Sequence, residues 1–162
     1  MTLQNRIALI TGSSSGIGRA VALAMATAGA DIVINHPTPR EADAASEIAD
    51  QICSMGRRAL VIEADIADEQ AVASMVECAT RELGRIDILV NSAADYARTP
   101  LSSLTDEEWD AMLALNLTAP MRLMREAVRA GATNLVNIVD VGAWQPWPNH
   151  AAYTTAKAGL LH

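Results

Sequence analysis

The sequence predicts a Rossmann-like α/β fold in three layers, with a doubly wound parallel sheet between two layers of helices. Five short apolar runs alternate with longer stretches of good helix formers, and a glycine-rich turn joins the first run to the first helix. The runs are continuous, as is typical of strands buried on both faces of a parallel sheet. A chain of 162 residues has room for one core, so we expect a single domain, 1–162.

The apolar runs and the stretches between them predict the elements in order. The expected strands are Ile7–Ile10, Asp31–Asn35, Ala59–Glu63, Ile86–Val90 and Asn134–Val139. The expected helices are Gly18–Ala28, Arg40–Met55, Asp68–Leu83, Thr105–Arg129 and a last one from about Ala151. Strict alternation with short loops predicts right-handed connections.

Two signals shape the fourth helix. Thr105 and Glu108 have the spacing of a capping box, which predicts a helix start at Thr105. Pro120 lies inside the same stretch, and proline cannot donate its backbone hydrogen bond. We therefore expect a kink, or the entry of a second helix, at Pro120.

Charge and cysteine usage exclude several classes of function. The net charge is -7 and no basic cluster occurs, which argues against nucleic acid and against an anionic membrane surface. No apolar run is long enough to span a bilayer. Cys53 and Cys78 both fall in predicted helices, so we expect no disulfide and a reducing, cytoplasmic compartment.

The sequence stops soon after its most informative helix. His162 lies about one turn beyond Lys157, so nothing follows that would cover the expected strand Asn134–Val139. We expect a chain truncated at its C-terminus, with further strands missing.

The glycine-rich turn predicts a phosphate-binding site. Glycines at a strand-to-helix turn let the backbone approach a pyrophosphate, and the helix N-terminus attracts its charge. The spacing is Gly-x3-Gly-x-Gly, not the common Gly-x-Gly-x2-Gly, and tight packing alone would also explain it. The candidate cofactor-binding residues here are Gly12, Ser14, Ser15, Gly16, Ile17 and Gly18.

The end of the second strand bears on which nicotinamide cofactor binds. An acidic residue there would hold the adenosine ribose hydroxyls and repel a 2′-phosphate. The sequence has Asn35 and His36 instead, and Arg40 follows as a possible charge partner. This pattern favours NADP(H) over NAD(H), although Asn35 and His36 would also suit a simple turn of the chain.

Tyr153 and Lys157 are candidates for acid–base chemistry. Residues four apart share one helix face, and an ammonium beside a phenol lowers the pKa of the phenol. Tyr153 is then a candidate general acid or base. An ordinary tyrosine and lysine on a helix would show the same spacing. Asp140, thirteen residues before Tyr153, completes the candidate catalytic set.

Together these motifs resemble the short-chain dehydrogenase/reductase family. The match rests on the turn Thr11–Gly18, Asp65 in Glu63–Ile66, Asn91–Ala94, Asn116 and the Tyr153-x3-Lys157 pair. The resemblance implies that the cofactor contacts Asp65, Ile66, Asn91, Ser92, Ala93, Tyr153 and Lys157, besides the turn and the residues Asn35 and His36. It further implies that Asn116 holds a water in a proton relay, while Lys157 binds the nicotinamide ribose.

Family members run to roughly 250 residues, so about a third of such a chain is missing here. They are usually dimers or tetramers, which implies a homo-oligomer for the full-length protein.

Asp140 departs from the family pattern, because most members have serine there. A carboxylate cannot donate a hydrogen bond to a carbonyl oxygen, and it raises the pKa of a nearby phenol. Either the site is impaired, or the substrate offers nitrogens that suit an aspartate. The second alternative resembles the pteridine reductase branch, although that branch often has arginine where this chain has Gly16. Tyr96, Asp140, Trp144 and Trp147 are the candidate substrate residues.

The sequence therefore supports three functional hypotheses and predicts no metal site. The leading one is an NADPH-dependent reductase of a pterin or similar heterocycle, with Tyr153 as proton donor. The first alternative is a carbonyl or alcohol oxidoreductase acting on a 3-oxoacyl thioester, sugar or steroid-like substrate. The second alternative is a nucleotide-binding fragment without turnover.

Overall fold

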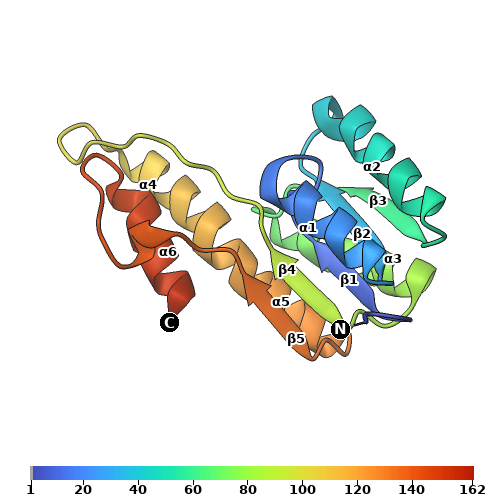
Figure 1. Cartoon of the computed structure of the whole chain (residues 1–162). Helices are drawn as coiled ribbons and strands as arrows, with labels where there is room; N and C mark the ends of the chain where they lie inside the picture. The colour runs from blue at the N-terminus through green and yellow to red at the C-terminus, as the bar shows by residue number, and fades with distance from the viewer. Residues whose placement is uncertain (1) are drawn as a thin grey trace.

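The computed structural model describes residues 2–162 and has one five-stranded parallel sheet with the order β3-β2-β1-β4-β5 (Figure 1). Its strands are β1 (Ile7–Ile10), β2 (Asp31–His36), β3 (Ala59–Glu63), β4 (Ile88–Asn91) and β5 (Asn134–Asn137). Its α-helices are α1 (Gly16–Thr27), α2 (Ala42–Ser54), α3 (Glu69–Leu83), α4 (Asp106–Leu113), α5 (Ala119–Arg129) and α6 (Ala151–Leu161). The predicted three-layer Rossmann-like architecture is confirmed.

Two separate cores cover the two faces of the sheet. On one face, α1 and α2 pack on alternate residues of the central strands, such as Ile10 and Ile32. On the other face, α3 and α5 pack on the intervening residues of the same strands, such as Leu9 and Val33. Because successive strand residues point to opposite faces, the continuous apolar runs serve both cores.

The two edge strands correct the expectation that all strands are buried on both faces. β3 is only half-buried, and β5 leaves Leu135 and Val136 about two-fifths exposed, at 40% and 43%. The three inner strands of the sheet, β2, β1 and β4, are fully buried. Four strand bounds also differ from the prediction: β2 ends at His36, not Asn35, β4 spans Ile88–Asn91, not Ile86–Val90, and β5 ends at Asn137, not Val139.

The predicted helix Thr105–Arg129 is divided into two helices. The capping box of Thr105 and Glu108 is present and begins α4. A π-helical turn, Ala114–Thr118, separates α4 from α5, and Pro120 lies in the first turn of α5. The helical backbone is continuous here, and the π-helical turn directly before α5 changes the hydrogen-bond ladder that proline cannot join. Figure 1 shows α4 beside α6, beyond the carboxyl ends of β4 and β5.

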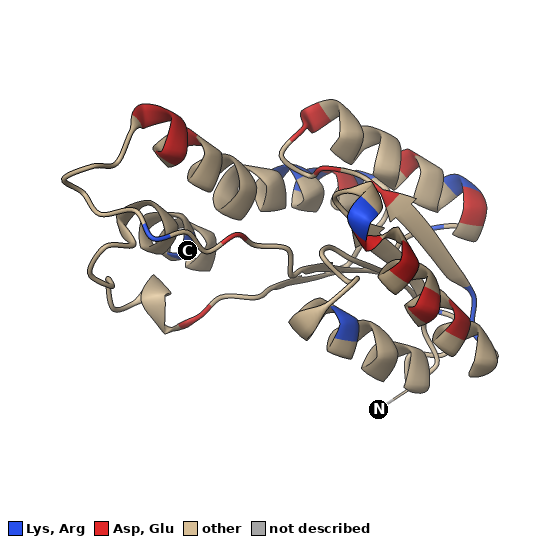
Figure 2. Ribbon diagram, turned by 90° about the horizontal axis from the view of Figure 1, so that it is seen from above, with Lys and Arg blue, Asp and Glu red and all other residues tan. Residues whose placement is uncertain are grey.

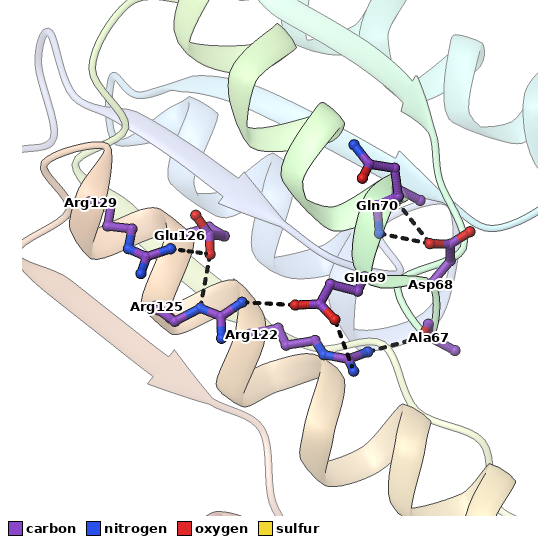
Figure 3. Close-up of polar contacts among 9 residues, drawn as sticks. Ala67, Asp68, Glu69, Gln70, Arg122, Arg125, Glu126 and Arg129 are labelled. Carbon is purple, nitrogen blue, oxygen red and sulfur yellow. Dashed lines mark hydrogen bonds and ion pairs between the residues drawn. The ribbon is translucent and has the colours of Figure 1, made fainter.

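Ion pairs join the helices α3 and α5 on the surface (Figure 3). Glu69 of α3 accepts from Arg125 at 3.2 Å and lies 3.4 Å from Arg122. Glu126 lies 2.9 Å from both Arg125 and Arg129. Such exposed pairs contribute less to stability than the buried Leu123 beneath them.

Two buried aspartates hold the amino ends of the central strands. Asp87 accepts hydrogen bonds from Arg6 and Arg85, each at 2.7 Å, and from the amide of Ile7 at 3.0 Å. Asp31 is held in the same way by Arg57 and Arg58. Their charges are therefore compensated inside the protein, which an isolated buried carboxylate would require.

The surface agrees with the charge pattern of the sequence. In Figure 2 the basic and acidic segments are spread over the helices, and no long basic stretch occurs. Within residues 2–162, no helix combines the length and apolarity needed to cross a membrane. Cys53 is exposed and Cys78 is half-buried, and both thiols are free.

Candidate active site

A cavity of about 430 Å³ lies at the carboxyl ends of the strands, beside the glycine-rich turn. Open α/β sheets bind ligands at this edge, at the point where the strand order reverses. Here that point lies between β1 and β4. Among the predicted cofactor residues, those that line the cavity are Gly12, Ser14, Ser15, Gly16, Ile17, Gly18, Asn35, Asp65, Ile66, Ser92 and Ala93.

The three glycines of the turn have different surroundings. Gly12 has a positive φ of 61°, and a Cβ there would lie 2.8 Å from the Cα of Ala93. A Cβ on Gly18 would collide with the carbonyl oxygen of Gly12. A Cβ on Gly16 would meet nothing within 4 Å, so this position leaves open space beside the cavity. The turn thus combines tight packing with room for a ligand at the N-terminus of α1, which suits a pyrophosphate.

Asn35 is turned inward at the end of β2. Its Oδ1 accepts from the amide of Gly12 at 3.3 Å, and its Nδ2 donates to the carbonyl of Ala64 at 3.0 Å. Its side chain therefore joins the glycine-rich turn to the loop after β3. His36 is also buried, and its Nδ1 lies 2.9 Å from the carbonyl oxygen of Thr38, so His36 does not line the cavity.

The residues after β2 give the cavity an acidic wall that the sequence reasoning missed. Arg40, expected as a charge partner for a 2′-phosphate, is exposed and is not a lining residue. Glu41 lines the cavity instead, and its Oε2 accepts a hydrogen bond from the hydroxyl of Ser14. The sequence gave no warning, because Glu41 lies in a 3₁₀ turn six residues beyond the position where an acid was sought. Pro37, Ala64, Ala94 and Leu115 complete the lining.

The loops after β3 and β4 form the opposite wall. Asp65 is exposed, and its Oδ1 accepts from the amide of Ala67 at 2.9 Å. The amides of Ser92 and Ala93 both donate to the hydroxyl of Thr11 at 3.1 Å, which fixes this loop against β1. Asn91 is buried away from the cavity, where its Nδ2 donates to Oδ1 of Asn137 at 2.9 Å. That position suits its expected support of the sheet.

Tyr153 and Asp140 meet, as the resemblance to the family implied. Tyr153 lies in the first turn of α6, and its hydroxyl donates to Oδ2 of Asp140. Asp140 caps a short 3₁₀ turn, where its Oδ1 accepts from the amide of Gly142 at 2.7 Å. Both carboxylate oxygens therefore already hold one hydrogen bond each.

The electrostatics of Tyr153 correct one expectation. Burial raises the pKa of Tyr153 above its usual value near 10, and the hydrogen bond and charge of Asp140 raise the pKa further. Lys157 was expected to lower that pKa. Its Nζ lies 5.8 Å from the centroid of the Tyr153 ring and donates to the carbonyl of Ile138 at 3.1 Å. Burial lowers the pKa of Lys157, while the charge of Asp140 opposes that shift.

An aromatic cluster surrounds Tyr153. Trp147 stacks on the Tyr153 ring at a centroid distance of 6.3 Å, and Tyr96 meets that ring edge-on at 5.1 Å. His150, which was not predicted, stacks on Tyr96 at 4.5 Å, and its Nε2 lies 3.0 Å from the Tyr96 hydroxyl. Its place one residue before α6 was the signal available in the sequence. Trp144 is 64% exposed and lies outside this cluster.

Asn116 lies in the π-helical turn and is fully buried. Its Nδ2 donates to the carbonyls of Asp95 at 3.2 Å and Met112 at 3.1 Å. Its Oδ1 has no hydrogen-bond partner among residues 2–162, so an acceptor is available here. A buried acceptor without a partner is costly, which fits a position that holds a bound water.

Tyr153, Lys157, His36 and Asn91 are the expected cofactor residues that do not line the cavity. Within the described part of the chain, no group of three or more His, Cys, Asp or Glu side chains could hold a metal ion.

Comparisons with known proteins agree with this site. The profile of the short chain dehydrogenase family matches residues 6–162. A short-chain type dehydrogenase/reductase of Picea abies is 36% identical, over 98% of this chain and 62% of its own length. A 3-oxoacyl-(acyl-carrier-protein) reductase of Synechocystis sp. is 33% identical, over 98% of this chain and 65% of its own length.

A solved structure also matches closely. The crystal structure of a blue fluorescent protein from a metagenomic library, in complex with NADPH, has a TM-score of 0.94 at 30% identity. The match covers 99% of this chain and 66% of that chain. The present chain thus spans less than two thirds of the length of these relatives. Because the family profile covers nearly the whole sequence, the chain belongs to the short-chain dehydrogenase/reductase family.

Proposed function

We propose that this chain provides the dinucleotide site and the proton-transfer residues of an NAD(P)-dependent oxidoreductase. The observation that carries the proposal is the hydrogen bond from Tyr153 to Asp140, with Lys157 on the same helix face. The cavity at the glycine-rich turn offers the backbone of that turn to a pyrophosphate. A bound nicotinamide would supply or accept a hydride.

The chain's own residues would bind and orient the cofactor. Ser15 and Gly16 present backbone amides at the start of α1, where the helix dipole favours phosphate. Asp65 and Ile66 would meet the adenine, while Ser92 and Ala93 would pass beside the nicotinamide half. Asn116 would hold a water near the Asp95 carbonyl, and Lys157 would hold the nicotinamide ribose.

Tyr153 would hold the proton that the substrate receives. In the structure its hydroxyl proton points to Asp140, and the raised pKa of Tyr153 keeps that proton in place. A substrate N–H or protonated ring nitrogen can replace the hydroxyl as the donor to Asp140, which frees Tyr153 to donate elsewhere. A plain ketone cannot, because its oxygen only accepts hydrogen bonds. This difference favours a pterin or similar nitrogen heterocycle, with Tyr96 and Trp147 as flat walls.

A carbonyl or alcohol substrate is the second candidate. The observation in its favour is the similarity to the 3-oxoacyl-(acyl-carrier-protein) reductase of Synechocystis. For such a substrate, Tyr153 would turn from Asp140 toward the carbonyl oxygen, and the carboxylate would remain as a charge that opposes oxyanion formation.

The cofactor choice depends on residues at the adenosine end. Asn35 in place of an acid and the nearby Arg40 favour NADP(H), as does the NADPH bound to the similar metagenomic protein. The carboxylate of Glu41 lies at the same end and opposes a 2′-phosphate.

We further propose a homo-oligomer in the cytoplasm. Met121 and Val128 of α5 are about half exposed, at 45% and 53%, and would lie in a contact between copies. The two free cysteines suit a reducing compartment.

The experiment that tests the function is oxidation of NADPH and NADH by the protein with three substrates side by side. These are a dihydropterin, a 3-oxoacyl thioester and a simple ketone. We expect turnover of the dihydropterin, lost in Asp140→Ser while ketone turnover increases. Equal ketone turnover by the unmutated protein would contradict the heterocycle assignment. Tight nucleotide binding without any turnover would instead support a binding fragment.

A further inference from the structure

Glu41 stands at the adenosine end of the cavity, where the strand itself offers no charge. Asn35 is 1% exposed, and its side-chain amide already forms hydrogen bonds with Gly12 and Ala64. His36 is buried, and the Nδ1 of its imidazole lies within hydrogen-bond distance of the carbonyl oxygen of Thr38. Recognition of the adenosine ribose therefore passes to the next lining residues along the chain, which are Pro37 and Glu41.

The Glu41 carboxylate is held in position at both its backbone and its side chain. The 3₁₀ turn Pro39–Glu41 begins with a proline, whose fixed φ stiffens the turn. The Glu41 Oε2 accepts from the hydroxyl of Ser14, which is 3% exposed in the glycine-rich turn. A hydrogen bond to a buried hydroxyl keeps the charge at the cavity rather than in bulk solvent.

No cation balances this charge within the cavity. The charged residues that line it are Glu41 and Asp65, and no lysine or arginine lines it within the described part of the chain. Arg40, the neighbour of Glu41 in sequence, is exposed and does not line the cavity. A 2′-phosphate would therefore meet a carboxylate, whereas a 2′-hydroxyl could donate a hydrogen bond to it.

We propose that Glu41 is the residue that selects the cofactor, and that it selects NAD(H) against NADP(H). The proposal rests on the proposed dinucleotide site and reverses the preference that Asn35 and Arg40 suggest from the sequence. The acid that discriminates between the cofactors then lies on a turn outside the sheet, where it accepts a hydrogen bond from Ser14 of the glycine-rich turn. Discrimination of this kind works by repulsion of the wrong ligand as much as by attraction of the right one.

The test compares nucleotide binding by the unmutated chain, Glu41→Gln, Glu41→Ala and Asp43→Asn. Asp43 is an exposed acid in the first turn of α2 and does not line the cavity, so it serves as the matched control. Calorimetry would measure Kd for NADH and NADPH, and for AMP and adenosine 2′,5′-bisphosphate. These adenosine probes report the same preference without the nicotinamide half or any turnover.

We expect the unmutated chain and Asp43→Asn to bind NADH and AMP about tenfold or more tightly than their 2′-phosphorylated counterparts. Both Glu41 variants should shift that ratio about tenfold toward the phosphorylated ligands, and 0.5 M salt should narrow the ratio in the unmutated chain. If folded Glu41 variants bind both cofactors with an unchanged ratio of Kd values, the role of Glu41 is overturned, while the proposed dinucleotide site remains. Failure of every nucleotide to bind the folded chain would overturn the proposed function, and this proposal with it.

Discussion

The hydroxyl of Tyr153 donates its hydrogen bond to Asp140 and not to the nearby backbone or to solvent. This pairing reverses the usual effect of a lysine near a catalytic tyrosine. Burial and the Asp140 carboxylate raise the pKa of Tyr153, while Lys157 is engaged with Ile138. The phenol therefore stays protonated until something displaces it from Asp140.

Asp140→Asn should lower the pKa of Tyr153, because the neutral amide removes the carboxylate that stabilises the phenol. The measurement is the ultraviolet absorbance of tyrosinate against pH. Asp110→Asn, an exposed change on α4, should leave the titration unchanged. An unshifted curve in Asp140→Asn would show that burial alone sets the pKa.

Tyr153→Phe should reduce the rate of NAD(P)H oxidation by roughly 10² to 10⁴-fold, the usual contribution of a positioned general acid. The Kd for the cofactor should change little, because Tyr153 does not line the cavity. Stopped-flow kinetics and calorimetry on the same preparation separate the two quantities. A variant with full activity would remove Tyr153 from the proton path.

Gly18→Ala and Gly16→Ala should behave differently although they are two residues apart. A Cβ at position 18 collides with the Gly12 carbonyl, so the turn must move, and we expect loss of nucleotide binding with clear destabilisation. A Cβ at position 16 meets no atom, and its φ of 54° costs about 1 kcal/mol. Thermal unfolding of both variants gives the comparison, and equal losses would contradict the steric account.

Asp87→Asn should lower the free energy of unfolding at pH 7 by about 1–3 kcal/mol. Burial acts to raise the pKa of Asp87, but hydrogen bonds from Arg85, Ile7 and Arg6 outweigh it and lower the pKa. A lowered pKa gives stability that is present above the unfolded value near 4 and is lost as the pH falls through the folded one.

The deficit of Asp87→Asn should therefore shrink as the pH falls below about 4 toward the lowered pKa of the folded aspartate. Denaturant titrations at pH 7 and at lower pH check this, with exposed Asp50→Asn as the control. A deficit independent of pH would assign the loss to packing.

His150→Leu should release the loop that carries Tyr96. His150 contacts the Tyr96 hydroxyl through Nε2 and the Ala97 carbonyl through Nδ1, each at 3.0 Å. We expect a severalfold higher KM for substrate with cofactor Kd unchanged, since neither residue lines the cavity. His150→Gln, which keeps a polar group, should lose less. A changed cofactor Kd would show that the loop serves the dinucleotide instead.

Much of the fold followed from local patterns. Continuous apolar runs and the glycine-rich turn predicted the sheet. The starts of α3 and α4 agreed within one residue, because their caps, Asp68 and Thr105, are local signals. The division of the fourth helix was less visible, since a π-helical turn depends on tertiary packing as well as on Pro120. The partial burial of β3 also depends on position in the sheet, which the composition of a strand does not encode.

The site divides in the same way. The Tyr153–Asp140 contact was expected from the family resemblance, which pairs these two positions. The direction of the Lys157 side chain could not be predicted, because it depends on the hydrogen bond that Nζ donates to the carbonyl of Ile138. His150 and Glu41 were missed because each acts through a side-chain contact with a residue that is distant in sequence, Tyr96 and Ser14 respectively.

The inward turn of Asn35 has a practical consequence for redesign. A residue near the end of the second strand sets cofactor preference in many dinucleotide sites, but here Asn35 joins the glycine-rich turn to the loop after β3. A charged replacement at that point would loosen both segments. Glu41 lies on a separate short turn, so substitutions there leave the sheet and its hydrogen bonds untouched. With the role proposed for Glu41, folding and cofactor choice are carried by different residues, and the second can be varied while the first is kept.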